Sequence, residues 1–112
     1  MIGNQLDIDF ELESREFNGK WYTDVKEAIT ISNKEQKPML MFFTGSDWCG
    51  WCIRLQKEVF QTPYFTQWAK ENVILVELDF PRSKPQTEAI KVQNRGLQQQ
   101  FGVRGYPTCW FV

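Results

Sequence analysis

Apolar residues gather at two places in the chain, in the uninterrupted run Met39–Phe43 and over Val73–Leu78, where Glu77 is the one polar residue. Runs of this length are typical of strands that are covered on both faces of a sheet. A third apolar segment, residues 109–112, predicts a last strand. The alternation of apolar and acidic residues over 7–13 predicts a short edge strand.

Between these strands, the sequence predicts helices. We expect one from about residue 23 to 35, which ends before Pro38 because proline disfavours the helical conformation of the residue before it. A short helix is expected to begin at Thr62 and Pro63, a capping threonine followed by proline in the first helical position. A polar helix follows from about 86 to 101. Strands that alternate with helices predict an α/β fold with right-handed crossovers.

Length and composition limit the function classes. A chain of 112 residues, 42% of them hydrophobic, is expected to make one globular domain, and we expect a monomer. The formal net charge is −1 with interspersed signs, so there is no electrostatic footprint for nucleic acid or an anionic membrane. The longest apolar run has strand length, far short of the roughly 20 residues of a membrane span. A polar and acidic segment follows Met1, so no signal peptide is recognised.

The residues with the clearest chemistry are Cys49 and Cys52, which are separated by Gly50 and Trp51. Both cysteines fit on the first turn of a helix, where unpaired N–H groups and the helix dipole lower a thiol pKa from about 8.5 towards neutrality. Cys49 is therefore expected to be the nucleophile, and Cys52, which is better buried, the resolving thiol. Gly50 lets a substrate backbone come close. Trp51 is expected to be partly exposed and to offer a flat apolar contact.

Two features around the pair affect the thiolate and its helix. Ser46 or Asp47 is suited to cap this helix. The chain has no histidine whose imidazolium would stabilise the thiolate. The pair is therefore expected to be a weaker oxidant than one flanked by histidine.

Other uses of the cysteine pair are less well supported. A structural zinc site usually needs four ligands, and haem attachment needs a histidine where Ile53 stands. The sequence thus predicts no metal and no cofactor, with two cysteines that merely pack as the alternative.

These motifs resemble the thioredoxin superfamily, because a buried strand precedes residues 48–52 and a Gly-Tyr-Pro-Thr segment follows at 105–108. Within the superfamily, residues 44–52, 58–60 and 76–81 are similar to DsbH-type periplasmic disulfide reductases of bacteria. The resemblance implies a thioredoxin-like fold with a central mixed sheet flanked by helices. It also implies disulfide-containing protein substrates, a thiol/disulfide electron donor and a periplasmic location, with a cytoplasmic location as the alternative.

The resemblance also implies roles for residues around the pair. Pro107 would be a cis-proline that faces the disulfide, and the backbone at Tyr106 would pair with a substrate strand by β-addition. An ordinary trans-proline is the alternative. From the residue types, we expect Trp48, Trp51 and Tyr106 to form an apolar rim that receives unfolded substrate. The remaining tryptophans are expected in the core: Trp21, Trp68 and Trp110.

One departure from the superfamily concerns the proton of the buried thiol. Classical thioredoxins carry a buried aspartate in the strand before the active site and a lysine in the next strand. Here the first of these strands contains no acid, and Leu75 or Val76 stands where the lysine would be. Proton transfer at Cys52 must therefore use another group or water. Glu58 and Asp47 are the candidates, and a solvated or capping role is the alternative for each.

A second departure is the ending, because a thioredoxin domain continues into one more strand and a C-terminal helix. Both are missing here, so we expect an N-terminal extension over 1–19 and a C-terminally incomplete thioredoxin-like domain over 20–112, with replacement of the usual ending by the N-terminal segment as the alternative. Cys109 shares a strand face with Pro107. We expect it to be a buried core thiol, with a redox role as the alternative.

Together, the sequence predicts a thiol–disulfide oxidoreductase that reduces protein disulfides through Cys49 and Cys52. An isomerase or oxidant of the same fold is one alternative. A non-catalytic binding module that keeps the fold is another.

Overall fold

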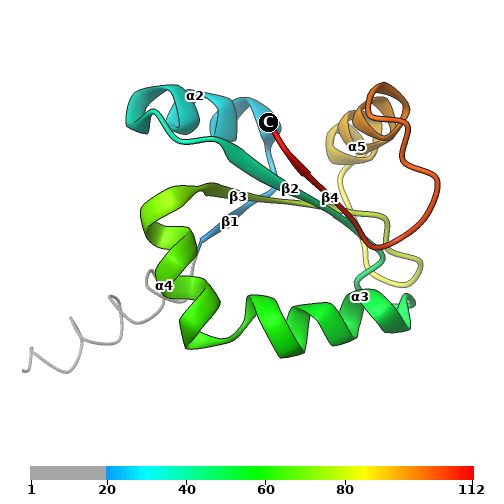
Figure 1. Ribbon diagram of the computed structural model, residues 1–112. Helices are drawn as coiled ribbons and strands as arrows, with labels where there is room; N and C mark the ends of the chain where they lie inside the picture. The colour runs from blue at the N-terminus through cyan, green and yellow to red at the C-terminus, as the bar shows by residue number, and fades with distance from the viewer. Residues whose placement is uncertain (1–19) are drawn as a thin grey trace, which may run out of the picture.

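Four strands form a single sheet in the order β1–β3–β2–β4 in the computed structural model, which describes residues 20–112 (Figure 1). The strands are β1 Trp21–Tyr22, β2 Met39–Thr44, β3 Ile74–Asp79 and β4 Thr108–Phe111. Strands β1 and β2 run parallel to β3, and β4 runs antiparallel to β2. The sheet is therefore mixed, and the two predicted buried runs pair at its centre. The edge strand predicted within 7–13 lies outside the described residues.

The helices are α2 Val25–Glu35, α3 Gly50–Leu55, the π-helical turn η1 Gln56–Phe60, α4 Pro63–Asn72 and α5 Glu88–Gln100. The predicted start of α4 is confirmed, since the Thr62 hydroxyl accepts the Phe65 N–H at 3.2 Å and Pro63 is the first helical residue. Helix α2 is capped by Asp24. No helix in residues 20–112 is both long and apolar enough to span a membrane.

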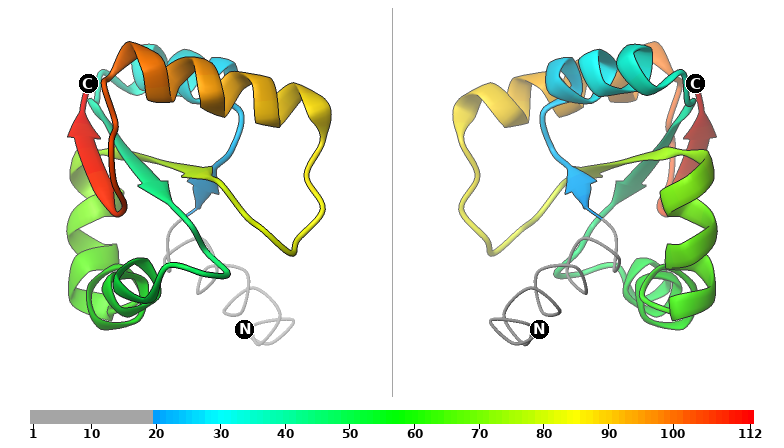
Figure 2. Two further views of the ribbon diagram at one scale, coloured as in Figure 1. Left: turned by 90° about the vertical axis from the view of Figure 1, so that its right-hand side faces the viewer. Right: turned by 90° about the vertical axis from the view of Figure 1, so that its left-hand side faces the viewer.

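Helices α2 and α5 lie on one side of the sheet, and α3, η1 and α4 lie on the other (Figures 1 and 2). Side chains alternate between the faces of a strand, so each face buries its own apolar cluster. The first face buries Ala28, Met39, Met41, Phe43, Ile74, Val76, Leu78 and Val103. The second face buries Leu40, Phe42, Cys49, Cys52, Phe60, Ala69, Val73 and Leu75. The two cysteines thus belong to the second core.

Two of the three tryptophans predicted for the core are exposed. Trp68 is 41% and Trp110 is 42% exposed, so that prediction was wrong for both. Trp110 lies on the outermost strand, where its ring contacts Phe101 at 5.5 Å, and Trp68 lies on an outer part of α4. Trp21 is half-buried and packs its ring against Phe60 at 5.2 Å, in line with the prediction.

Candidate active site

Cys49 caps the N-terminus of α3. Its backbone is extended, and its sulfur accepts the backbone N–H of Cys52 at 3.2 Å. Cys49 and Cys52 form a disulfide, with Cα atoms 5.2 Å apart. A backbone N–H that points at a cysteine sulfur stabilises negative charge on that sulfur when the pair is reduced. The structure therefore gives Cys49 the surroundings of a thiolate.

The burial of this segment follows the order that the sequence predicted. Cys52 is 1% exposed and Cys49 is 7% exposed, whereas Trp51 between them is 69% exposed. Gly50 is also exposed, and a Cβ added there would meet no heavy atom within 4 Å. The approach to the disulfide is thus open over Gly50 and Trp51.

Neither Ser46 nor Asp47 caps α3, contrary to the prediction, because both side chains are engaged elsewhere. The Asp47 carboxylate accepts the backbone N–H groups of residues 82–84 at 2.8 to 3.1 Å. These bonds, that of Arg82 foremost, lower the pKa of Asp47. Ser46 donates from its N–H and its hydroxyl to the Asp79 carboxylate at 2.9 and 2.5 Å. Asp47 therefore fastens a loop rather than facing the Cys52 thiol.

Trp48 forms a wall beside the disulfide and is held in place from several sides. Its indole N–H donates to the carbonyl of Phe80 at 2.6 Å, and its ring meets the edge of Tyr106 at 5.7 Å. The Arg82 guanidinium lies over the same ring at 4.1 Å. A Cβ at Gly45 would overlap the indole, so only glycine leaves room for it there. Trp48 is thus half-buried and held in place, and its part in an apolar rim for substrate stays a prediction.

Tyr106 and Pro107 precede β4 and lie beside the active-site helix. Their peptide bond is cis. The Tyr106 hydroxyl accepts a hydrogen bond from Gln98 at 2.6 Å, which anchors this segment to α5. Pro107 lines a cavity of about 480 Å³ together with Trp51, Arg54, Leu55, Glu58 and Val59. An open cavity therefore connects the exposed tryptophan with the proline.

Glu58, the other candidate for proton transfer, lies on the exposed side of the helix. Its carboxylate pairs with Arg54 at 2.9 Å, and its side chain is 60% exposed. The solvated role that was weighed as the alternative fits this position. Glu58 does not line the cavity that Cys52 lines on the other side of the helix from this ion pair.

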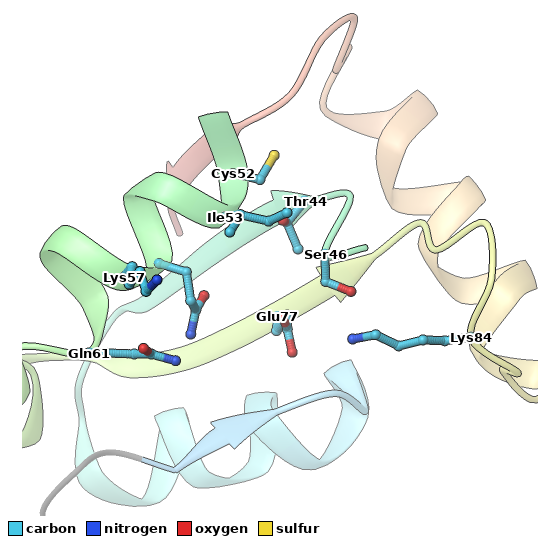
Figure 3. Close-up of a pocket in the computed structure, with 9 residues that line it drawn as sticks. Thr44, Ser46, Cys52, Ile53, Lys57, Gln61, Glu77 and Lys84 are labelled. Atoms are coloured by element: carbon cyan, nitrogen blue, oxygen red, sulfur yellow. The ribbon is translucent and has the colours of Figure 1, made fainter. Parts of the chain in front are cut away.

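The sequence interpretation missed Glu77. In β3, Leu75 packs in the same core as Cys52, and Glu77 follows two residues later on the same face. Glu77 is half-buried and lines a cavity of about 380 Å³ that also reaches Cys52 (Figure 3). Burial raises the pKa of Glu77; Asp79 adds to this, and Lys84 opposes it. An acid inside an otherwise apolar strand was the signal available in the sequence.

Cys109 is exposed, which contradicts the prediction of a buried core thiol. It lies on the outermost strand, opposite Phe42 of β2. Neighbouring groups shield part of it from water and raise the pKa of its thiol. Within residues 20–112, no group of three or more His, Cys, Asp or Glu side chains gathers in a way that would hold a metal ion.

The chain is similar to several known proteins. A family model described as a thioredoxin-like domain matches residues 25–112. The chain is 40% identical over 86 residues to disulfide bond reductase DsbH of Chlamydia pneumoniae, which covers 77% of this chain and 52% of DsbH. It is 34% identical over 87 residues to thioredoxin-related protein DsbJ of Chlamydia pneumoniae, which covers 78% of this chain and 25% of DsbJ. The chain thus spans about half the length of the first relative.

Solved structures show the same fold. A structure titled DsbH oxidoreductase matches with a TM-score of 0.78 and 38% identity, over 83% of this chain and 64% of that one. A thioredoxin from Thermus thermophilus matches with a TM-score of 0.62 and 17% identity, over 82% of this chain and 62% of that one. The second match, at its low identity, concerns the fold alone.

Proposed function

Because this chain belongs to the thioredoxin-like domain family, we propose that it is a thiol–disulfide oxidoreductase that reduces disulfides in protein substrates. One observation carries the proposal: Cys49 caps α3, accepts the Cys52 N–H on its sulfur and is bonded to Cys52. This arrangement suits a nucleophilic thiolate that has its resolving thiol within reach.

The proposed reaction has two exchange steps. The Cys49 thiolate attacks one sulfur of the substrate disulfide, so a mixed disulfide forms and the other substrate sulfur leaves as a thiolate. Cys52 then loses its proton and attacks the Cys49 sulfur, which closes the Cys49–Cys52 disulfide and releases the second substrate thiolate. Two electrons pass from the dithiol to the substrate. A thiol/disulfide electron donor returns the pair to its reduced form.

The cavity between Trp51 and Pro107 is the proposed substrate groove. Trp51 offers an exposed aromatic face, and Arg54 and Val59 extend the lining along the helix. The backbone at Tyr106 precedes β4, where an extended substrate segment can add by main-chain hydrogen bonds. We propose that unfolded or extended segments, rather than folded surfaces, enter here.

The direction of the reaction is proposed as reduction. Gly50 and Trp51, the residues between the cysteines, carry no charge that would add to the stability of the thiolate. The similarity to a protein named disulfide bond reductase favours the same direction. By the same similarity we propose a periplasmic or other extracytoplasmic location.

Turnover of insulin disulfides with dithiothreitol as donor tests the proposal. Cys49→Ser should lower the catalysed rate by at least about 100-fold, because no group replaces the nucleophile. The matched control is Cys109→Ser, which changes the exposed thiol outside the pair and should keep the wild-type rate. Equal rates for the wild type and Cys49→Ser would instead identify a binding module that does not use the pair.

A further inference from the structure

Glu77 occupies a place on the sheet where an apolar side chain would continue the core. It pairs with Phe42 across β2 and β3. Phe42 and Leu75, its neighbours on this face, are both buried in the cluster that contains Cys52. Burying a carboxylate in such surroundings is unfavourable unless the group is neutral or compensated. The unfavourable burial of the Glu77 carboxyl group therefore suggests that this residue has a function.

The cavity beside Glu77 is polar and reaches the active-site helix. Thr44 and Ser46 contribute hydroxyl groups to its wall, and Figure 3 shows them with Cys52 and Glu77 among the residues that line this cavity. Its volume of about 380 Å³ exceeds the roughly 30 Å³ share of one water in the liquid many times. Polar walls of this kind favour ordered water, which can carry a proton between groups that do not touch.

Charged groups from three parts of the chain lie near Glu77 or line its cavity. Asp79 follows on β3 and repels a second negative charge, Lys84 comes from the loop after β3, and Lys57 comes from η1. The Asp79 carboxylate is already held by Ser46 at 2.5 Å. Burial and Asp79 together outweigh Lys84 and raise the pKa of Glu77, so its carboxylate takes up a proton more readily than an exposed glutamate does.

We propose that Glu77 exchanges a proton with Cys52 through water in this cavity, and thereby sets the rate at which Cys52 resolves the mixed disulfide. The Cys52 proton passes through water to the Glu77 carboxylate. The sulfur electron pair that is freed forms the bond to Cys49, and the substrate sulfur leaves with the pair of the broken bond. Glu77 later gives its proton to solvent. The inference rests on the proposed function, and it assigns the proton acceptor to a residue other than Asp47 or Glu58.

The first test compares Glu77→Gln with Glu71→Gln, a matched control on the exposed surface of α4. The rate of substrate release from the mixed disulfide should fall about 10- to 100-fold in Glu77→Gln at neutral pH, and Glu71→Gln should match the wild type. Glu77→Asp should recover part of the rate because it restores a carboxylate. A pH–rate profile of Glu77→Gln that superimposes on the wild-type profile would overturn the inference.

The second readout separates proton transfer from a purely electrostatic effect. In a Cys49→Ser/Cys109→Ser background, Cys52 is the only one of the three cysteines that remains, so thiolate absorbance near 240 nm reports its pKa once the tyrosine signal of a variant with all three cysteines replaced by serine is subtracted. Removing a negative charge with Glu77→Gln should lower the pKa of Cys52 or leave it unchanged. A slower resolving step together with such a pKa requires a lost proton acceptor. A rise in the pKa of Cys52 large enough to account for the slower step would contradict the proposal.

A third measurement uses the wild-type protein and does not depend on any variant. If Glu77 and Cys52 share a proton path, the NMR titration of the Glu77 carboxyl carbon should shift between the reduced and the oxidised protein. Identical titrations would rule the coupling out. Failure of this inference is distinct from failure of the proposed function, because the latter would already show as undiminished insulin turnover in Cys49→Ser.

Discussion

On the face of the sheet that α2 and α5 cover, β3 contributes Ile74, Val76 and Leu78, all at most 7% exposed. On the face that α3, η1 and α4 cover (Figure 2), the same strand contributes Leu75, Glu77 and Asp79. The first face is closed by apolar side chains along the whole strand. The second begins as a core and ends as a polar cavity beside Cys52. The difference indicates that the first face mainly stabilises the fold, while the second also holds the cysteine pair.

The largest expected effect lies on the closed face. Phe43 is fully buried there and packs against Phe101 at 6.2 Å. Phe43→Ala should lower the free energy of unfolding by about 3–5 kcal/mol, because it removes buried apolar area and leaves a cavity. Urea unfolding measures this value. A loss below about 1 kcal/mol would mean that the closed face does not carry the stability assigned to it.

The next effect concerns Trp48, which packs against the core that contains the cysteine pair. Gly45→Ala should displace the Trp48 indole and lower the free energy of unfolding by about 1–3 kcal/mol. Gly50→Ala is the matched control for stability, since open space surrounds that position, and it should stay within about 0.5 kcal/mol. Equal losses in the two variants in urea would show that Trp48 does not need the close approach.

Replacing the acid on the second face should make the two faces alike. Glu77→Leu should raise the free energy of unfolding at neutral pH by about 1 kcal/mol, because an apolar side chain continues the core without the cost of partly burying a carboxyl group. Since the folded-state pKa of Glu77 is raised, wild-type stability should fall as the pH rises from the ordinary value of 4.5 through the raised pKa.

Urea unfolding of the oxidised protein at pH values across this window checks both statements. The decline should be absent in Glu77→Leu and present in Glu71→Gln. A Glu77→Leu variant that keeps the full decline would place its cause at another group.

The smallest effect concerns Asp47, in the turn between β2 and α3, and it has the opposite sign in pH. Its folded-state pKa is lowered by the N–H groups of residues 82–84, so its stabilising contribution is complete above about 3.8 and is lost as the pH falls through the lowered pKa. Asp47→Asn should remove this part of the acid sensitivity. Unfolding curves recorded below pH 5 test the sign, and an unchanged acid limb would contradict it.

Much of the fold could be read from the sequence because its signals are local. The apolar run Met39–Phe43 became β2 at the centre of the sheet, and Thr62 with Pro63 began α4 as expected. Cys49 and Cys52 came together at a helix start because their spacing alone places them there. In each case the residue type and its sequence neighbours were enough.

The remaining features depend on partners far away in the sequence. Asp47 is of a residue type that often caps helices, but backbone N–H groups more than 30 residues later bind its carboxylate instead. The sequence shows Glu77 only as part of a buried strand. That it lines the same cavity as Cys52 depends on how α3 and β3 come together in the fold. Trp110 was placed in the core on residue type, although it lies on the outermost strand of the sheet. Tertiary context decided all three positions.

The most direct test of the account is the reduction potential of the Cys49–Cys52 pair, measured by equilibration with a glutathione redox buffer. A reductase of protein disulfides should have a potential close to the about −270 mV of thioredoxin. A value at or above the about −180 mV of protein disulfide isomerase would contradict reduction and favour an isomerase or an oxidant.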